Sequence, residues 1–180
     1  FSEPAARTAD RIIAQINPKM PTLGGKKISL DKIDYIVPAE SGLYTIGRAE
    51  IDAKTQTIAD YVAELVEDGA TIQLGIGALP DAIARNLMGK KDLGVHSETL
   101  TEAMMELVQA GVINNSKKTL NPGICIGAQA AGSEKFYEFI DHHPLFAVYP
   151  VDYVNDPYVV GQNYKQTSIN SCMEVDLKGQ

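Results

Sequence analysis

Strand-like and helix-like segments alternate along the last two thirds of the chain, and this alternation limits its possible folds more than any other feature. The expected strands and the helices that follow them are 70–75 with 79–89, 92–96 with 99–111, and 123–129 with 132–143. Each strand-like segment is a short apolar run, and each helix-like segment repeats its apolar residues at helical spacing. Repeated pairs of this kind predict an α/β fold with open, largely parallel sheets and flanking helices.

The first third of the chain reads differently. Short strands are expected near 11–16 and 33–37. Residues 39–48 contain two glycines and no hydrophobic periodicity, so they form a candidate linker. A longer helix should follow over 49–69, because Ile, Val and Leu recur there at intervals of three, four and seven, and Gly69 stands where a helix commonly ends. At the other end, 145–154 reads as extended and 167–177 as a longer strand.

Composition and charge exclude several classes of protein. A net charge of −7 gives no broad positive surface for nucleic acid or acidic membranes. No apolar run approaches the roughly 18 residues of a membrane span. The use of cysteine indicates a cytoplasmic protein. Cys125 and Cys172 lack metal-type spacing and read as buried thiols, and the three histidines make no zinc pattern, so no metal site is expected.

The segment "QLGIGALPDAIA", residues 73–84, is a strand, a glycine-bearing loop and a helix. Ligands bind beyond the carboxyl ends of strands in open α/β sheets. Gly75 and Gly77 would let backbone N–H groups approach a phosphate or a developing oxyanion at the start of the helix. A tight turn without a ligand explains the loop equally well, and Pro80 replaces the third glycine of a dinucleotide-binding motif.

Glu98, in "LGVHSETL", occupies the same relative position after the next strand. Its loop should therefore open at the same edge of the sheet as residues 75–79. A carboxylate near backbone N–H donors stays ionised and can act as a nucleophile or base. The alternative is an acid at a helix start, stabilised by the helix dipole.

Other polar residues are weaker candidates. His96 ends its strand and is expected to pack or hydrogen-bond there, and His142 and His143 follow a helix, where the dipole favours a cation. We interpret the remaining candidates as solvated: Glu174 and Asp176 on one face of a strand, and Lys117 and Lys118 in a loop.

At "GATIQLGIGALPDAI" followed by "KKDLGVHSE", the sequence resembles the acetyl-CoA hydrolase/transferase family of class I coenzyme A transferases, especially its 4-hydroxybutyrate and butyryl-CoA:acetate CoA-transferase group. The resemblance covers nearly the whole chain. Further stretches that carry it are "INPKMP", "KIDYIV", "GVINNSKKTLNPG", "YPVDYVNDP" and "INSCMEVDLKGQ".

The resemblance implies two open α/β domains with the active site between them. Residues 1–45 would then be the C-terminal part of the first domain, and residues 46–180 the N-terminal part of the second. The chain begins with Phe1 and stops just after an apparent strand, so we expect a fragment of a longer protein. The part that follows would carry another glycine-rich loop for coenzyme A.

The resemblance also implies an activity and a site. The family's catalytic glutamate falls on Glu98, and its G-x-G-x-x-P motif falls on Gly75, Gly77 and Pro80. The expected reaction moves coenzyme A from a short-chain acyl-CoA to a carboxylate such as acetate, through a glutamyl-CoA thioester. The residues expected to contact coenzyme A, which is a substrate and not a resident cofactor, are Gly75, Ile76, Gly77, Ala78 and Leu79.

Two alternatives stay open. The same site would serve an acyl-CoA hydrolase, in which water takes the glutamyl-CoA thioester. The second alternative is a truncated, non-catalytic chain that folds only as part of a larger protein or oligomer. We expect a homo-oligomer whose partners are acyl-CoA and a short-chain carboxylate.

Overall fold

The computed structural model describes residues 1–48, 50–172 and 174–179, and it is an α/β fold in which every described strand pair is parallel. The elements are α1 (Ser2–Thr8), β1 (Ile13–Ile16), β2 (Gly24–Gly25), the 3-10 turn η1 (Leu30–Lys32), β3 (Tyr35–Pro38), α2 (Ala53–Leu65), β4 (Thr71–Leu74), α3 (Ala78–Asn86), η2 (Leu87–Gly89), β5 (Gly94–Val95), β6 (Thr99–Thr101), α4 (Glu102–Gln109), β7 (Cys125–Gly127), β8 (Gln129–Ala131), α5 (Glu134–Ile140), β9 (Phe146–Val148), α6 (Val151–Val154), α7 (Pro157–Val160) and β10 (Gln166–Ile169). The predicted fold class is confirmed.

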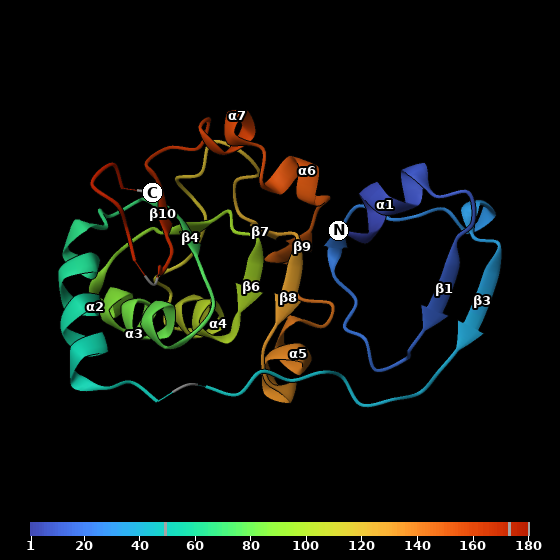
Figure 1. The fold of residues 1–180 in the computed structure, drawn as a ribbon, viewed down its shortest axis with the longest axis horizontal. Coiled ribbons are helices and arrows are strands. Elements are labelled where there is room, and N and C mark those ends of the chain that lie inside the picture. The colour runs from blue at the N-terminus through green and yellow to red at the C-terminus, as the bar shows by residue number, and fades with distance from the viewer. Residues whose placement is uncertain (49, 173, 180) are drawn as a thin grey trace.

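The strands form four small sheets in two lobes (Figure 1). In the larger lobe the strand orders are β10-β4-β5, β2-β9-β7 and β6-β8, and α2, α3 and α4 lie side by side against them. The smaller lobe holds α1 and the pair β1-β3. Residues 39–48 run from β3 along the larger lobe to α2, without regular structure, as predicted for a linker.

The core lies in the larger lobe and follows the predicted alternation. Apolar residues of β4, α3, β5 and α4 are fully buried together, among them Ile72, Ile83, Val95 and Met104. In the small lobe, by contrast, Ile13, Tyr35 and Ile36 are each more than half exposed. The β1-β3 pair therefore has no packed core of its own. The assignment of residues 1–45 and 46–180 to two domains stays a prediction, although β2 pairs with β9 and so belongs to the larger lobe's sheets.

Strands β5 and β6 are two stretches of one extended segment, and so are β7 and β8. The bridge between His96 and Ile126 and the ladder from Thr99 opposite Gln129 keep the same register on both sides of residues 97–98. The helix expected over 99–111 is therefore wrong at its start. Residues 99–101 are strand β6, and α4 begins only at Glu102.

Three further expectations need correction. Residues 151–154, expected to be extended, form α6, because Pro150 precedes them and its fixed φ suits a helix start. The strand expected over 167–177 ends at Ile169, and residue 173 of that stretch lies outside the described residues. Cys172 is exposed and not buried, whereas Cys125 is buried as expected.

Candidate active site

The loop between β4 and α3 presents unpaired backbone N–H groups. Gly77 caps α3 at φ 120° and ψ −176°, a conformation that is essentially restricted to glycine. The N–H of Gly75 is not available, because it donates to the carbonyl of Ile169 at 3.0 Å. Within the described part of the chain, the N–H groups of residues 76–79 have no acceptor, and Pro80, next in the first turn, has no N–H to satisfy.

Glu98 lies beside this loop. The parallel register pairs Ile72 with Val95, and the Ser97 hydroxyl donates to the Leu74 carbonyl at 3.3 Å, so the two strands stay adjacent up to their ends. After Leu74 the chain turns into the glycine loop, while the neighbouring strand continues through Glu98. The expected meeting of the two segments at one sheet edge is therefore found. The helix-start alternative for Glu98 is wrong, because Glu102 is the acid in the first turn of α4.

The carboxylate of Glu98 is half-buried and has a side-chain partner. Asn155, in the turn after α6, donates from Nδ2 to Oε2 of Glu98 at 2.5 Å. The main chain is held as well, because the N–H groups of Ala128 and Gln129 donate to the Glu98 carbonyl at 2.8 and 3.1 Å. Sequence reasoning missed Asn155, although it stands inside the "YPVDYVNDP" block.

His96 anchors the same two segments from inside the core. Its Nε2 lies 2.9 Å from the Val154 carbonyl, which can only accept, so Nε2 carries the proton. The ring is 1% exposed, and burial lowers the pKa of His96 below its usual value. Its Nδ1 has no partner among the described residues. A neutral, buried imidazole fits the expectation that His96 packs and hydrogen-bonds at the end of its strand.

Two hollows adjoin the glycine loop. A cavity of about 620 Å³ lies between residues 20–26 and 43–46 on one side and Ile76, Thr99 and Gln129 on the other. Mostly apolar side chains line it. Thr99, which immediately follows Glu98 in the chain, is among the lining residues.

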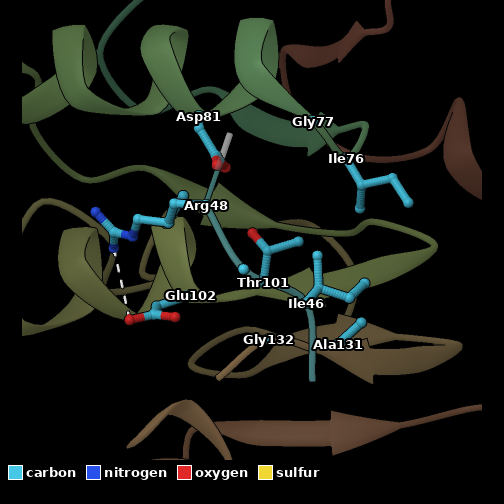
Figure 2. Close-up of a pocket in the computed structure, with 11 residues that line it drawn as sticks. Ile46, Arg48, Ile76, Gly77, Asp81, Thr101, Glu102, Ala131 and Gly132 are labelled. Carbon is cyan, nitrogen blue, oxygen red and sulfur yellow. Dashed lines mark ion pairs between the residues drawn. The ribbon is translucent and has the colours of Figure 1, made fainter. Parts of the chain in front are cut away.

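The second hollow, about 60 Å³, contains an ionic cluster (Figure 2). Arg48, from the linker, lies 3.7 Å from Glu102 and 2.5 Å from Glu106, both on α4. Burial raises the pKa of the nearby Asp81 carboxyl, and Arg48 opposes that shift. The linker is thus fixed next to Gly77 and Thr101, so it forms part of the wall beside the site.

The other predicted residues lie away from Glu98 or have structural roles. His142 and His143 follow α5 as expected. Glu174 and Asp176 are exposed but lie beyond β10, so their placement on a strand is wrong. Lys117 is exposed, whereas Lys118 is buried, which corrects its interpretation as a solvated residue. No cluster of three or more His, Cys, Asp or Glu suited to a metal occurs among the described residues.

Known proteins and families resemble this chain in sequence. Residues 132–180 match the family described as acetyl-CoA hydrolase/transferase C-terminal domain. Over all of its length the chain is 47% identical to the 4-hydroxybutyrate coenzyme A transferase of Clostridium kluyveri, of which it covers 42%. By these matches the chain is similar to the acetyl-CoA hydrolase/transferase family. It is also 37% identical to the succinyl-CoA:cyclohexane-1-carboxylate CoA transferase of Geobacter metallireducens, covering 41% of that relative.

Two solved structures share the fold of this chain. RipA from Yersinia pestis superposes with a TM-score of 0.93 at 36% identity, over 99% of this chain and 42% of that one. The 4-hydroxybutyrate CoA-transferase of Porphyromonas gingivalis gives 0.89 at 39% identity, over 97% of this chain and 45% of that one. The chain thus spans about two fifths of the length of the relatives that it matches. None of its described helices is long and apolar enough to cross a bilayer.

Proposed function

We propose that a protein containing this chain transfers coenzyme A between a short-chain acyl-CoA and a carboxylate, with Glu98 as the nucleophile. The observation that carries the proposal is the position of a half-buried carboxylate beside a loop whose N–H groups at residues 76–79 lack acceptors. An anionic nucleophile and donors for an oxyanion are the two parts that acyl transfer requires. The names of relatives that are 37% and 47% identical support it.

The reaction proceeds by exchange of bonds at one carboxylate. Glu98 attacks the thioester carbonyl, the C–S bond breaks, and an acyl-glutamyl anhydride and a CoA thiolate result. The thiolate then attacks the glutamyl carbonyl and releases the original acyl group as a free acid, which leaves a glutamyl-CoA thioester. An acceptor carboxylate attacks that thioester, and the same steps run in reverse to give the new acyl-CoA and free Glu98. No net proton transfer is needed.

Each attack builds negative charge on a carbonyl oxygen. The free N–H groups of Ile76, Gly77 and Ala78 are the proposed donors to that oxygen, and Gly75 takes part through its backbone shape, since its own N–H is bonded to Ile169. One donor of this kind contributes about 3–4 kcal/mol to the stability of the transition state. The apolar cavity next to Thr99 would take the acyl chain or the thioester arm.

The proposed substrates are butyryl-, 4-hydroxybutyryl- or acetyl-CoA with acetate as an acceptor. Relatives include proteins named 4-hydroxybutyrate coenzyme A transferase and butyryl-CoA:acetate CoA-transferase. Coenzyme A enters as a substrate, and no resident cofactor is required by the chemistry. We further propose that the protein is cytoplasmic and that it forms a homo-oligomer. Light scattering after size exclusion would test the oligomeric state.

Trapping the intermediate tests the proposal. A protein of the relatives' full length that contains this sequence, called the full-length protein below, is incubated with acyl-CoA and no acceptor, then reduced with borohydride. We expect the glutamyl thioester to become an alcohol within the peptide Lys91–Met104, and double-substrate plots to give parallel lines. Intersecting lines, or a label on Glu102 or Glu174, would overturn the assignment of Glu98.

A hydrolase is the second candidate, because the matching family model is described as hydrolase/transferase. Water would then take the glutamyl-CoA thioester in place of an acid. Release of free coenzyme A with and without added acetate separates the two activities. Transfer requires acetate and gives acetyl-CoA, whereas hydrolysis releases free thiol in the absence of acetate.

A further inference from the structure

The larger lobe has a gap in its backbone hydrogen bonds between β5 and the start of β7, three residues before Glu98. Strand β5 belongs to the sheet β10-β4-β5, and β7 belongs to β2-β9-β7. Among the described residues, one bridge joins them, from His96 to Ile126, where the Ser97 N–H donates to the Ile126 carbonyl at 3.0 Å. Before that bridge, a regular ladder is absent among the described residues of the two strands.

Two side chains from residues 115–118 fill this gap. Lys118 donates from Nζ to the Val95 carbonyl at 2.7 Å and to the Ile124 carbonyl at 2.6 Å. Asn115 accepts from the Val95 N–H at 2.9 Å, and its Nδ2 contacts Sγ of Cys125 at 3.2 Å. One loop therefore supplies hydrogen bonds to both strands where the backbone does not.

The space for Lys118 is made by a glycine. A Cβ on Gly94 would lie 2.4 Å from Cγ and 2.8 Å from Cδ of Lys118, so no other residue at position 94 allows this lysine to lie as it does. The lysine side chain is 5% exposed. A buried ammonium costs free energy unless it is hydrogen-bonded, which makes a purely accidental placement unfavourable.

We propose that Lys118 is a positioning residue for Glu98, because its ammonium holds the strand that carries Glu98 against β7. Val95 lies three residues before Glu98 on the same extended segment. Loosening the contact at Val95 lets this segment shift relative to the Gly75–Leu79 loop, which lies on the neighbouring strand. This inference rests on the proposed role of Glu98 as the nucleophile.

The titration of Lys118 gives the proposal a measurable consequence, a pH dependence of activity. Burial lowers the pKa of Lys118 to about 8. The titratable groups that face it are Cys125, whose pKa burial raises to about 11, and His96, whose lowered pKa leaves it neutral. Neither changes its charge near pH 8, and hydrogen bonds from a neutral amine to carbonyls are weaker than those from an ammonium.

Stability and activity should then respond to pH in opposite directions. Between about pH 8 and the ordinary lysine value of 10.5, the unfolded chain holds the extra proton, so the contribution of Lys118 to the free energy of unfolding rises with pH. A lysine with only a structural role would therefore not lower activity per folded molecule in this window. A positioning lysine would, because Glu98 loses its alignment as the ammonium deprotonates.

The test uses Lys118→Met and Lys117→Met in the full-length protein. Lys117 is the adjacent, exposed lysine and serves as the matched control. We expect Lys118→Met to lower kcat by about ten- to a hundredfold, as a misplacement near 1 Å does, with the KM for acyl-CoA unchanged. The fall in wild-type kcat through pH 8 should vanish in Lys118→Met and persist in Lys117→Met. A wild-type kcat in Lys118→Met, or a persisting fall near pH 8, would overturn the proposal.

A second variant covers the case in which Lys118→Met does not fold. Gly94→Ala keeps the amine but displaces its stem, so kcat should drop at every pH between 6 and 9; unchanged kcat in that variant would also overturn the proposal. Failure of the proposed function looks different. In that case borohydride does not label Glu98, whatever the Lys118 variants do. Labelling of Glu98 together with normal Lys118→Met kinetics removes only the positioning role.

Discussion

Nδ2 of Asn155 donates to Oε2 of Glu98 at 2.5 Å, and it does so from a turn that His96 fixes through the Val154 carbonyl. The carboxylate is thus oriented by a neutral amide, which does not quench its charge. An amide partner preserves nucleophilicity, whereas an arginine or lysine in the same place would hold the carboxylate in an ion pair.

Replacing Asn155 by alanine should lower kcat by about ten- to a hundredfold, the effect of losing one hydrogen bond to a charged group. Asn155→Asp should be worse at neutral pH, because two carboxylates in contact cannot both ionise easily. The exposed Asn114, which bonds Asp92, provides the control variant Asn114→Ala. Steady-state transfer rates in the full-length protein measure the effect, and equal rates in all three variants would contradict it.

Two substitutions of Glu98 should distinguish the effect of moving its carboxylate from the effect of removing it. Glu98→Asp withdraws the carboxylate by about one methylene, and we expect a loss of about a hundredfold in kcat. Glu98→Gln has no nucleophile and should lose transfer with an unchanged thermal unfolding midpoint. Glu64→Gln, at an exposed position on α2, is the control. Near-normal transfer by Glu98→Gln would refute the assigned role.

The two glycines of the loop should not respond alike. Gly77→Ala forces a side chain into the glycine-only region at φ 120°, at a cost of about 1–3 kcal/mol, and rearranges the free N–H groups around it. A Cβ at Gly75 would lie no closer than 3.3 Å to Asn170 Oδ1, 3.6 Å to Pro80 Cγ and 3.8 Å to the Ile169 carbonyl, and the φ of Gly75 is ordinary. Transfer kinetics should therefore show the larger loss of kcat for Gly77→Ala. The reverse order would argue against donors at residues 76–78.

Acid should weaken the fold through His96. Burial lowers the pKa of His96 below its ordinary value of 6.5, so the native state disfavours the protonated ring. The contribution of His96 to stability is complete above pH 6.5 and is lost as the pH falls below it. His96→Gln keeps an N–H donor and should reduce the pH dependence of the urea midpoint between pH 7 and 5. His142→Gln, at an exposed position, should leave it unchanged.

The alternation of strands and helices predicted the fold because each buried strand and each amphipathic helix has its own periodicity. Strand β6 was missed because three residues, Thr99–Thr101, are too few to show a period and run directly into the apolar pattern of α4. Helix α6 was read as extended because valine and tyrosine favour strands in isolation. In both places the neighbouring chain decides the conformation.

Some residues of the candidate site could be predicted from the sequence, and others could not. Glu98 and the glycine loop follow adjacent strands, so sequence order was enough to bring them to one edge. Asn155 reaches Glu98 only through the fold, since α5, β9 and α6 must first bring its turn to β5. Nothing in the pair Lys117-Lys118 indicates that one lysine is exposed and the other is buried. Contacts of this kind depend on tertiary packing that a local pattern does not carry.

The main-chain anchoring of Glu98 has a consequence for the whole catalytic cycle. Its carbonyl is bonded to Ala128 and Gln129, and the segment is paired on both sides of it. On the proposed route the glutamate changes its covalent partner several times while its own Cα stays in place. The ligands must then supply the motion: the acid departs, the thiol turns back to attack, and the acceptor arrives, all at a stationary reaction centre.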